Sequence, residues 1–393
     1  MVTTLSESDG FVDTLRTVLG STPTPIALHE PEFAGAEWSY VRDCLDTGWV
    51  SSVGKYVNEF ESRLATFTGA RHAVAVVNGT AALHAALLAA DVRVGDEVLL
   101  PTLTFVATAN AISYCRAIPH FLDSAEDRLG IDPAVLADYL ETVAERTADG
   151  FRNRNTGRRL AAVVPVHVFG HPVDMPALLA VADKFALPVV EDAAESLGSW
   201  IGDRHVGTFG RMGVLSFNGN KIVTTGGGGA ILTDDGELAR RLKHLTTTAK
   251  VPHPWEFVHD EVGLNYRLPN INAALGCAQL ERLPDMLARK RRLAEAYANA
   301  FVNRRDVSIV REPAGCRSNY WLNAVLLSEP AQSRRDAYLS AANDAGYQCR
   351  PVWRLMHRLP MYEACPRASL PIAERLEQSL INLPSSAKLA ERG

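Results

Sequence analysis

The sequence predicts an α/β protein: a large three-layer domain with a mostly parallel sheet, followed by a smaller α+β domain. Between about residues 70 and 235, short runs rich in β-branched residues alternate with helical patterns. The runs are apolar at nearly every position, which is typical of strands that helices cover on both faces. After about residue 250 a long helical pattern replaces this alternation. We therefore divide the chain into an N-terminal segment with the large domain, residues 1–250, and a small domain, residues 251–393.

The elements follow from the local patterns. Two apolar stripes at helical spacing precede the first strand, and both are expected to face the core: Trp38, Val41 and Leu45, then Val57, Phe60, Leu64 and Phe67. The predicted strands are residues 73–77, 97–100, 117–122, 160–166, 188–191, 213–217 and 229–233. In the small domain, residues 271–283 are expected to be helical, and the helix is expected to break at Pro284 and resume to about Phe301.

The composition indicates an ordinary globular protein that does not bind nucleic acid. The 393 residues are 47% hydrophobic and 22% charged, and the formal net charge is -5. Such a balance gives no basic surface for nucleic acid or for an anionic membrane. The densest basic run, residues 289–292, is expected to form a solvated helix face.

Cysteine usage and the N-terminus bear on the compartment and on metals. The six cysteines show neither a CxxC motif nor metal-type spacing, so we expect reduced thiols, a cytoplasmic location and no metal. The N-terminus does not resemble a secretory signal. The most apolar window, residues 73–92, is interrupted by polar residues, so it predicts a buried strand and helix and no membrane association.

One lysine stands out in the stretch SFNGNKIVTTGGGGA, residues 216–230. A phosphate-binding loop has its lysine after the glycines, followed by Ser or Thr. Here Lys221 precedes the glycines and Ile222 follows it, which excludes that loop. The glycines at 226–229 are better explained by close backbone packing. The role of Lys221 must therefore come from its surroundings in the fold.

Residues suited to one cofactor follow several predicted strands, at the sheet edge where ligands collect. Gly79 and Thr80 open an Ala-rich helix, whose N-terminus can bind a phosphate or can simply be a capped turn. Asp192 closes another strand, a position that alone more often holds a helix cap. Together with Lys221 on a neighbouring segment, these residues match the lysine and acidic partner that pyridoxal 5′-phosphate requires.

Each residue then has an expected role. Lys221 must lose its charge to condense with an aldehyde, so it has to be desolvated or close to positive charge. Asp192 would keep the pyridine nitrogen protonated, which makes the ring an electron sink. Ser216 would join the helix N-terminus at the phosphate. Phe105 would stack on the ring or belong to the core, and Glu195 would reach the ring hydroxyl or be an ordinary acidic residue of a first helical turn.

Longer stretches carry a family resemblance. HEPEFAGAEWSYVRDCLDTGWVSSVGKYV, VNGTAALHAAL, PTLTFVATANAI, VEDAAESLGS, SFNGNKIVTTGGGGA and GLNYRLPNINAALGCAQLERL together resemble the DegT/DnrJ-type nucleotide-sugar aminotransferases, which are fold type I pyridoxal phosphate enzymes. The resemblance covers about residues 26–386. It places the cofactor lysine at Lys221 and the ring-nitrogen aspartate at Asp192. It also implies a homodimer with shared active sites, in which Asn265 contacts the cofactor phosphate of the partner subunit.

The resemblance also suggests a substrate. GNKIVTTGGGGA, NYRLPNINAALG, SNYWLN and RPVWRLMHRLPMY look most like 4-aminotransferases for UDP-linked 4-keto-6-deoxy-N-acetylhexosamines of bacillosamine and legionaminic acid pathways. Many relatives have GEGG where this chain has GGGG, which favours that subgroup. The expected amino donor is L-glutamate. The candidates for contact with the nucleotide sugar are His29, Trp49, Ser51, Arg267, Arg350, Trp353 and His357.

The sequence is also compatible with other functions. The substrate could be a dTDP- or GDP-linked 3- or 4-keto sugar. Sugar dehydratases of the same family typically have histidine in place of the lysine, so Lys221 argues against them. A pyridoxal phosphate-binding regulatory protein without turnover belongs to another class, and the presence of Asp192, Ser216 and Lys221 favours an enzyme over it.

Overall fold

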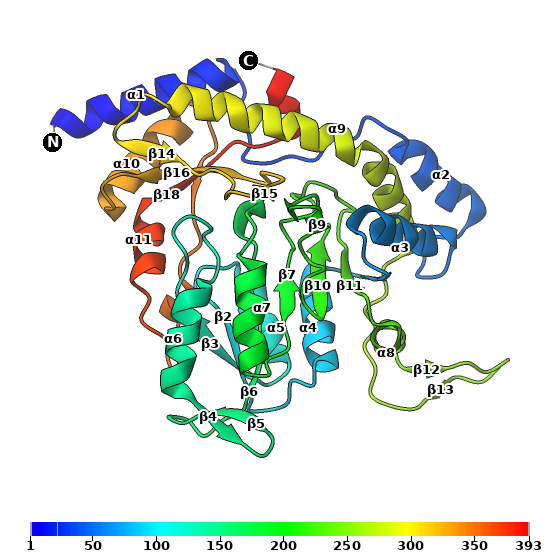
Figure 1. Ribbon diagram of the computed structural model, residues 1–393. Coiled ribbons are helices and arrows are strands. Elements are labelled where there is room, and N and C mark those ends of the chain that lie inside the picture. Colours follow the sequence, from blue (N-terminus) through cyan, green and yellow to red (C-terminus); the bar gives the residue numbers. More distant parts are fainter. Residues whose placement is uncertain (1, 22, 392–393) are drawn as a thin grey trace.

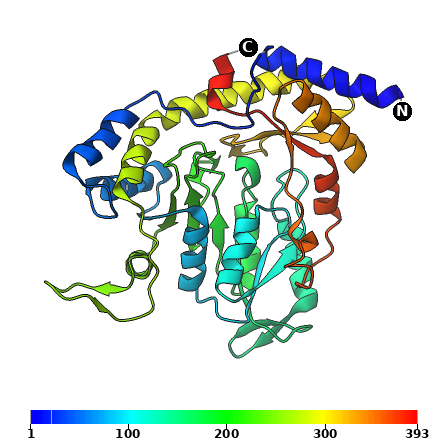
Figure 2. The ribbon, with the colours of Figure 1, turned by 180° about the vertical axis from the view of Figure 1, so that it is seen from behind.

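The computed structural model describes residues 2–21 and 23–391. Its centre is a sheet with the strand order β1-β11-β10-β7-β6-β2-β3 (Figures 1 and 2). The strands are β1 (His72–Val76), β2 (Glu97–Pro101), β3 (Ile118–Leu122), β6 (Leu160–Val163), β7 (Val190–Asp192), β10 (Met212–Ser216) and β11 (Gly229–Thr233). All the predicted strands are confirmed to within a few residues. The sheet is parallel except for β11, which runs antiparallel to both of its neighbours.

Helices cover both faces of this sheet, as the apolar strands require. Along β2, Val98 and Leu100 pack with α4 (Gly79–Ala89) and α5 (Val106–Tyr114), whereas Leu99 packs with α6 (Pro133–Val143) and α7 (Met175–Lys184). Figure 1 shows α6 and α7 in front of the sheet, and Figure 2 shows α4 and α5 on the other side. Successive side chains of a strand point to opposite faces, so every position of β2 is buried. The predicted three-layer α/β/α architecture is therefore confirmed.

A second, antiparallel sheet forms after the long helix α9 (Asn270–Phe301). Its strands lie in the order β14-β16-β18-β17, with β14 (Val307–Ile309), β16 (Asn323–Leu327), β17 (Arg350–Pro351) and β18 (Leu380–Leu383). Helices α10 (Gln332–Asp344) and α11 (Pro371–Ser379) accompany it. The first helix, α1 (Val2–Leu19), joins the same core through Phe11 and Leu15, which pack with Tyr297 and Tyr338. The division of the chain at residue 250 stays a prediction.

Shorter elements complete the described part of the chain. A two-stranded hairpin, β12 (Lys250–Val251) and β13 (Val258–His259), extends away from the body (Figure 1). The others are α2 (Glu37–Thr47), α3 (Lys55–Thr68), α8 (Gly236–Thr246), β4 (Ala144–Thr147), β5 (Gly150–Asn153), β8 (Trp200–Ile201), β9 (Arg204–His205) and β15 (Cys316–Arg317), with 3-10 turns at Val168–Gly170, Met356–Arg358 and Ala387–Glu391. Among the residues described, no helix combines the length and apolarity that crossing a bilayer demands.

Three sequence expectations about helices are wrong. Trp38 and Leu45 of α2 are 82% and 61% exposed, because α2 packs on α9 through the face that carries Cys44 and Glu37. Helix α9 continues through Pro284, with buried side chains both before and after it offsetting the lost backbone hydrogen bond. The basic run is not a solvated face, since Arg289 and Lys290 are buried.

Candidate active site

The carboxyl ends of the parallel strands border a cavity of about 340 Å³. It is lined by the start of α4, by the start of α5, and by the segments that follow β7 and β10. Trp321 and Trp353, from the part of the chain after α9, close the other side. The cavity therefore lies at the sheet edge where ligands bind in α/β proteins.

The start of α4 and the end of β10 form a close, polar corner of this cavity. Asn78 caps α4 by accepting the backbone N–H of Ala81 at 2.8 Å. A side chain at Gly79 would meet Cβ of Ser216 at 2.9 Å, so only glycine lets the helix approach that serine so closely. The first N–H groups of a helix have no partner within it, and the helix dipole favours an anion there. Gly79, Thr80 and Ser216 thus offer what a phosphate group needs.

Asp192 is a buried carboxylate without an ion-pair partner in the described residues. Its Oδ2 accepts the hydroxyl of Thr108 at 2.7 Å, and its Oδ1 accepts the N–H of Ala194 at 3.1 Å. Burial raises the pKa of Asp192, while these two hydrogen bonds and the charge of Lys221 act in the opposite direction. A protonated ring nitrogen would be a cationic partner for this carboxylate, which has none among the described residues.

Lys221 lies between a carboxylate and an indole ring. Its Nζ is 3.3 Å from Oε1 of Glu195 and 3.9 Å from the ring centroid of Trp321. The other carboxylate oxygen of Glu195 accepts the backbone N–H of Phe169 at 2.9 Å. Phe169 has φ 56°, a left-handed conformation that is uncommon for a bulky residue and is typical of functional sites. Burial raises the pKa of Glu195, and the charge of Lys221 opposes that effect.

Aromatic side chains border the same cavity. Phe105 is half-exposed and does not belong to the core, which leaves its ring free to cover a ligand. Its centroid is 6.3 Å from that of Trp353, which in turn lies 5.2 Å from that of Phe169. A planar ring could therefore be held between the strand ends and this wall.

These residues fit pyridoxal phosphate. The corner formed by Gly79, Thr80 and Ser216, called the glycine corner below, suits its phosphate. The unpaired buried carboxylate of Asp192 suits a protonated pyridine nitrogen. Lys221 supplies the only amine that lines the cavity among the described residues. The predicted residues Gly79, Thr80, Phe105, Asp192, Glu195, Ser216, Lys221 and Trp353 all come together here.

Other predicted residues lie outside this cavity in the single chain. Both ring nitrogens of His29 are buried beside the Trp321 ring, with centroids 6.4 Å apart. The rest are not among the lining residues either: Trp49 and Ser51 lie after α2, exposed Asn265 is hydrogen-bonded to Arg267, Arg350 is exposed, and His357 is bound to Thr102. Their contact with a substrate stays a prediction.

The sequence reasoning also missed residues that line the cavity. Thr104 and Thr108 stand 2.8 Å apart through their hydroxyls, and their spacing of one helical turn after a strand was a usable signal. Asn218 and Asn220, beside the lysine, were a similar signal. Trp321 had no such signal, because a distant part of the chain carries it to Lys221.

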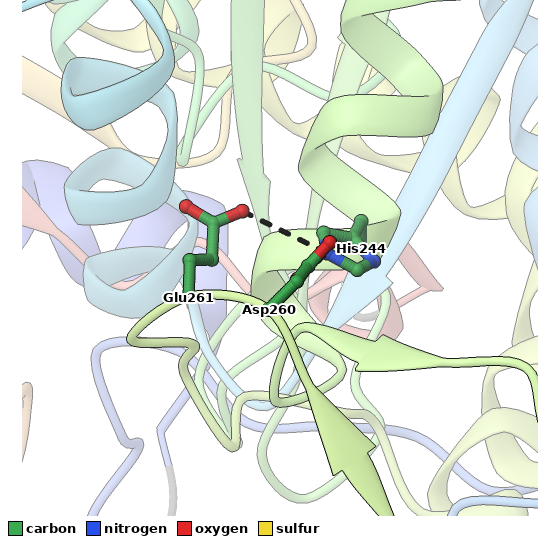
Figure 3. A group of neighbouring side chains, drawn as sticks. All are labelled: His244, Asp260 and Glu261. Carbon is green, nitrogen blue, oxygen red and sulfur yellow. Dashed lines mark hydrogen bonds and ion pairs between the residues drawn. The ribbon is translucent and has the colours of Figure 1, made fainter.

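A separate cluster of potential metal ligands lies at the base of the hairpin (Figure 3). Nε2 of His244 is 2.7 Å from Oδ1 of Asp260, and the ligand atoms of His244, Asp260 and Glu261 lie within 4.8 Å of one another. The guanidinium of Arg241 pairs with both carboxylate oxygens of Glu261. The cluster therefore acts as an ion-pair network that ties the hairpin to α8.

Comparison with known proteins places this geometry among aminotransferases. The model of the DegT/DnrJ/EryC1/StrS aminotransferase family matches residues 31–392. GDP-perosamine synthase of Caulobacter vibrioides is 37% identical over 369 residues, which are 93% of this chain and 94% of that protein. The putative pyridoxal phosphate-dependent aminotransferase EpsN of Bacillus subtilis is 35% identical over 370 residues, 93% of this chain and 92% of that protein. The structure of DesI with its TDP-sugar product has a TM-score of 0.81 at 30% identity, covering 95% of this chain and 91% of that one.

Proposed function

Since the chain belongs to the DegT/DnrJ/EryC1/StrS aminotransferase family and is a pyridoxal 5′-phosphate-dependent sugar aminotransferase, we propose that it aminates a nucleotide-linked 4-keto-6-deoxy sugar with L-glutamate as donor. One observation carries the proposal: Lys221, Asp192 and the glycine corner (Gly79, Thr80 and Ser216) converge on one cavity. The bound cofactor supplies an electron-withdrawing ring that stabilises negative charge on the carbon that loses a proton.

Three side chains of the chain have the remaining roles in the reaction. Asp192, oriented by Thr108 and the Ala194 N–H, holds the proton on the ring nitrogen. Nζ of Lys221 takes the α-proton of glutamate and later returns a proton to the sugar carbon. Proton transfer by a positioned group contributes about a hundredfold to ten-thousandfold to a rate. Glu195 holds the lysine amine toward the cavity between these transfers.

The nucleotide is proposed from the relatives. The sequence motifs favour a UDP-linked N-acetylhexosamine, whereas GDP-perosamine synthases from three organisms are 34–37% identical to this chain. We therefore place a GDP-linked 4-keto-6-deoxyhexose first and the UDP-linked sugar second. Incubating the enzyme with glutamate and matched GDP-, UDP- and dTDP-linked 4-keto-6-deoxy sugars, with product masses as the readout, distinguishes them. Amination of the dTDP-linked sugar alone would overturn both choices.

We also propose that the enzyme is a homodimer with shared sites. Trp38, Leu45 and Trp49 expose their side chains around α2, as do Trp255 and Phe257 on the hairpin. Exposed apolar patches commonly mark surfaces that a partner covers, which supports a dimer. Asn265 follows this hairpin, and in the proposed dimer it reaches the cofactor phosphate of the partner subunit. Light scattering with size exclusion gives the oligomeric state, and a monomer would contradict this proposal.

A further inference from the structure

Lys290 is a buried lysine that the reaction described above does not use. Its side chain, in the middle of α9, is 0% exposed, and no carboxylate of the described residues lies within 4.0 Å of its Nζ. Burial lowers the pKa of Lys290 to about 7. Burying an amine without a carboxylate partner costs folding free energy, which makes Lys290 a candidate for a role in the neighbouring site.

The amine of Lys290 is held by two backbone carbonyls from different parts of the chain. Its Nζ donates to the carbonyl of Trp321 at 3.1 Å and to the carbonyl of Ser385. The N–H of Ser385 donates to the carbonyl of Leu28 at 2.7 Å. Lys290 therefore joins the Trp321 segment to the C-terminal segment, which in turn holds the N-terminal segment that carries His29.

Trp321, whose carbonyl binds Lys290, also contacts the active site through its indole ring. Its indole Nε1 donates to the carbonyl of Asn220 at 2.8 Å, directly before Lys221. Nζ of Lys221 lies over the ring, 3.9 Å from its centroid, which is the geometry of a cation–π contact. Burial lowers the pKa of His29 well below its ordinary value, and the charges of Lys290 and Lys221 add to the effect, so the three groups lie within electrostatic range of one another.

We propose that Lys290 is a positioning residue of the active site, which fixes the backbone of Trp321 so that the indole covers and orients the amine of Lys221. The inference rests on the proposed role of Lys221. Lys290 itself touches neither substrate nor cofactor, and it acts on the reaction through Trp321.

The test compares two neighbouring buried cations of the same helix. Lys290→Met removes the amine and keeps a long apolar side chain. Arg289→Met is the matched control, because Arg289 is also buried but pairs with Glu32 at 2.9 Å and does not contact Trp321. In the holoenzyme, Lys290→Met should lower kcat of the complete transamination about tenfold, the scale of one lost contact at an active site, with little change in the KM for glutamate. Arg289→Met should lower Tm and leave kcat within about twofold of the native value.

A second readout does not depend on turnover. In the full chain without cofactor, trace acetylation by acetic anhydride followed by peptide mapping measures the accessibility of Lys221. Lys290→Met should raise the acetylation rate of Lys221 by about twofold or more, the lower end of what a cation–π contact is worth. Arg289→Met should not raise it. Equal acetylation and equal kcat in the two variants would overturn the proposal.

Two further variants keep the proposal testable if Lys290→Met does not fold. Lys290→Gln retains N–H donors and should restore part of the native rate. Trp321→Phe leaves the buried lysine untouched but removes the bond to Asn220, and it should also slow the complete transamination; a native rate and native acetylation in that variant would overturn the idea. Because Lys290 is proposed to act through Trp321, the double variant Lys290→Gln/Trp321→Phe should be about as slow as the slower of the two single variants, and multiplying effects would contradict this.

The two proposals fail in different ways. If borohydride reduction of the holoenzyme leaves no pyridoxyl phosphate label on Lys221, the assignment of Lys221 in the proposed function is wrong. If Lys221 carries the label but Lys290→Met has the native acetylation rate at Lys221 and the native kcat, only the role of Lys290 is wrong.

Discussion

Thr108 donates its hydroxyl proton to Asp192 at 2.7 Å, and this bond fixes the direction of a buried carboxylate. Thr108 stands at the start of α5 and Asp192 at the end of β7, so the bond joins two strand-to-helix connections at one edge of the sheet. The carboxylate then faces the same cavity as Lys221. The chemistry proposed for the site depends on this convergence of an acid and an amine from separate segments.

Replacing Asp192 should slow the reaction while sparing the fold. Asp192→Asn can still accept the Thr108 hydroxyl, but it cannot hold a proton on the ring nitrogen, so the rate should fall by about two to four orders of magnitude. Steady-state kinetics measure the effect. Asp132→Asn, at the N-cap of α6, is a control that keeps a capping side chain away from the cavity. A rate for Asp192→Asn close to that of the control would remove Asp192 from the mechanism.

Removing the amine should abolish turnover without unfolding the protein. Lys221→Ala should lower transamination by about a thousandfold or more, because no other amine lines the cavity among the described residues. Its Tm without cofactor should stay close to the native value. Lys184→Ala, at the exposed end of α7, is the matched control. Transamination by Lys221→Ala at near the native rate would refute the assignment.

The stability of the cofactor-free protein should carry a pH signature of the two buried acids. Burial raises the pKa values of Asp192 and Glu195, so both disfavour the folded state once they ionise. The stability associated with their raised pKa values is complete below their ordinary pKa values and is lost as pH rises through the folded ones. Glu195→Gln should therefore be more stable than the native protein at pH 8 and no more stable at pH 3.5.

Urea unfolding at the two pH values measures this difference. Glu363→Gln, at an exposed carboxylate, is the control and should show no such pattern. If Glu195→Gln and the native protein have equal free energies of unfolding at pH 8, burial does not destabilise the ionised carboxylate in the way described.

Shared active sites should allow two inactive variants to rescue each other. Asn265 lies outside the cavity of its own chain, next to the exposed hairpin. If it serves the partner subunit, co-expression of Lys221→Ala with Asn265→Ala gives mixed dimers with one complete site. The mixture should then recover about one quarter of native activity. Activity no higher than the mean of the two single variants would show that Asn265 does not act across the interface.

The sequence predicted the large sheet well because each strand is apolar on both faces and ends in a recognisable turn. The same local signals placed Gly79, Asp192 and Lys221 at one edge. The exposed side chains of Trp38 and Leu45 were mispredicted because the apolar stripe alone does not reveal which face of α2 packs on α9; that face carries Glu37 and Cys44. Pro284 was misjudged because tertiary packing on both sides of it outweighs a local preference.

The rest of the site depended on contacts between distant segments. Trp321 reaches Lys221 from the second sheet region, and Lys290 reaches the carbonyl of Trp321 from α9. Neither relationship has a periodic or spacing signal, because the residues are joined only by the folded chain. Lys290 was predicted to be solvated because it lies in a basic run, and the carbonyls that bind its amine come from distant segments.

The central claim is that the amine of Lys221 holds the cofactor, and borohydride reduction tests it most directly. Reduction of the holoenzyme, followed by proteolysis and mass spectrometry, should place a pyridoxyl phosphate group on the peptide that contains Lys221, and the label should be absent when glutamate is added before the borohydride. A label on another lysine, or no label at all in a protein that retains its cofactor, would contradict the account.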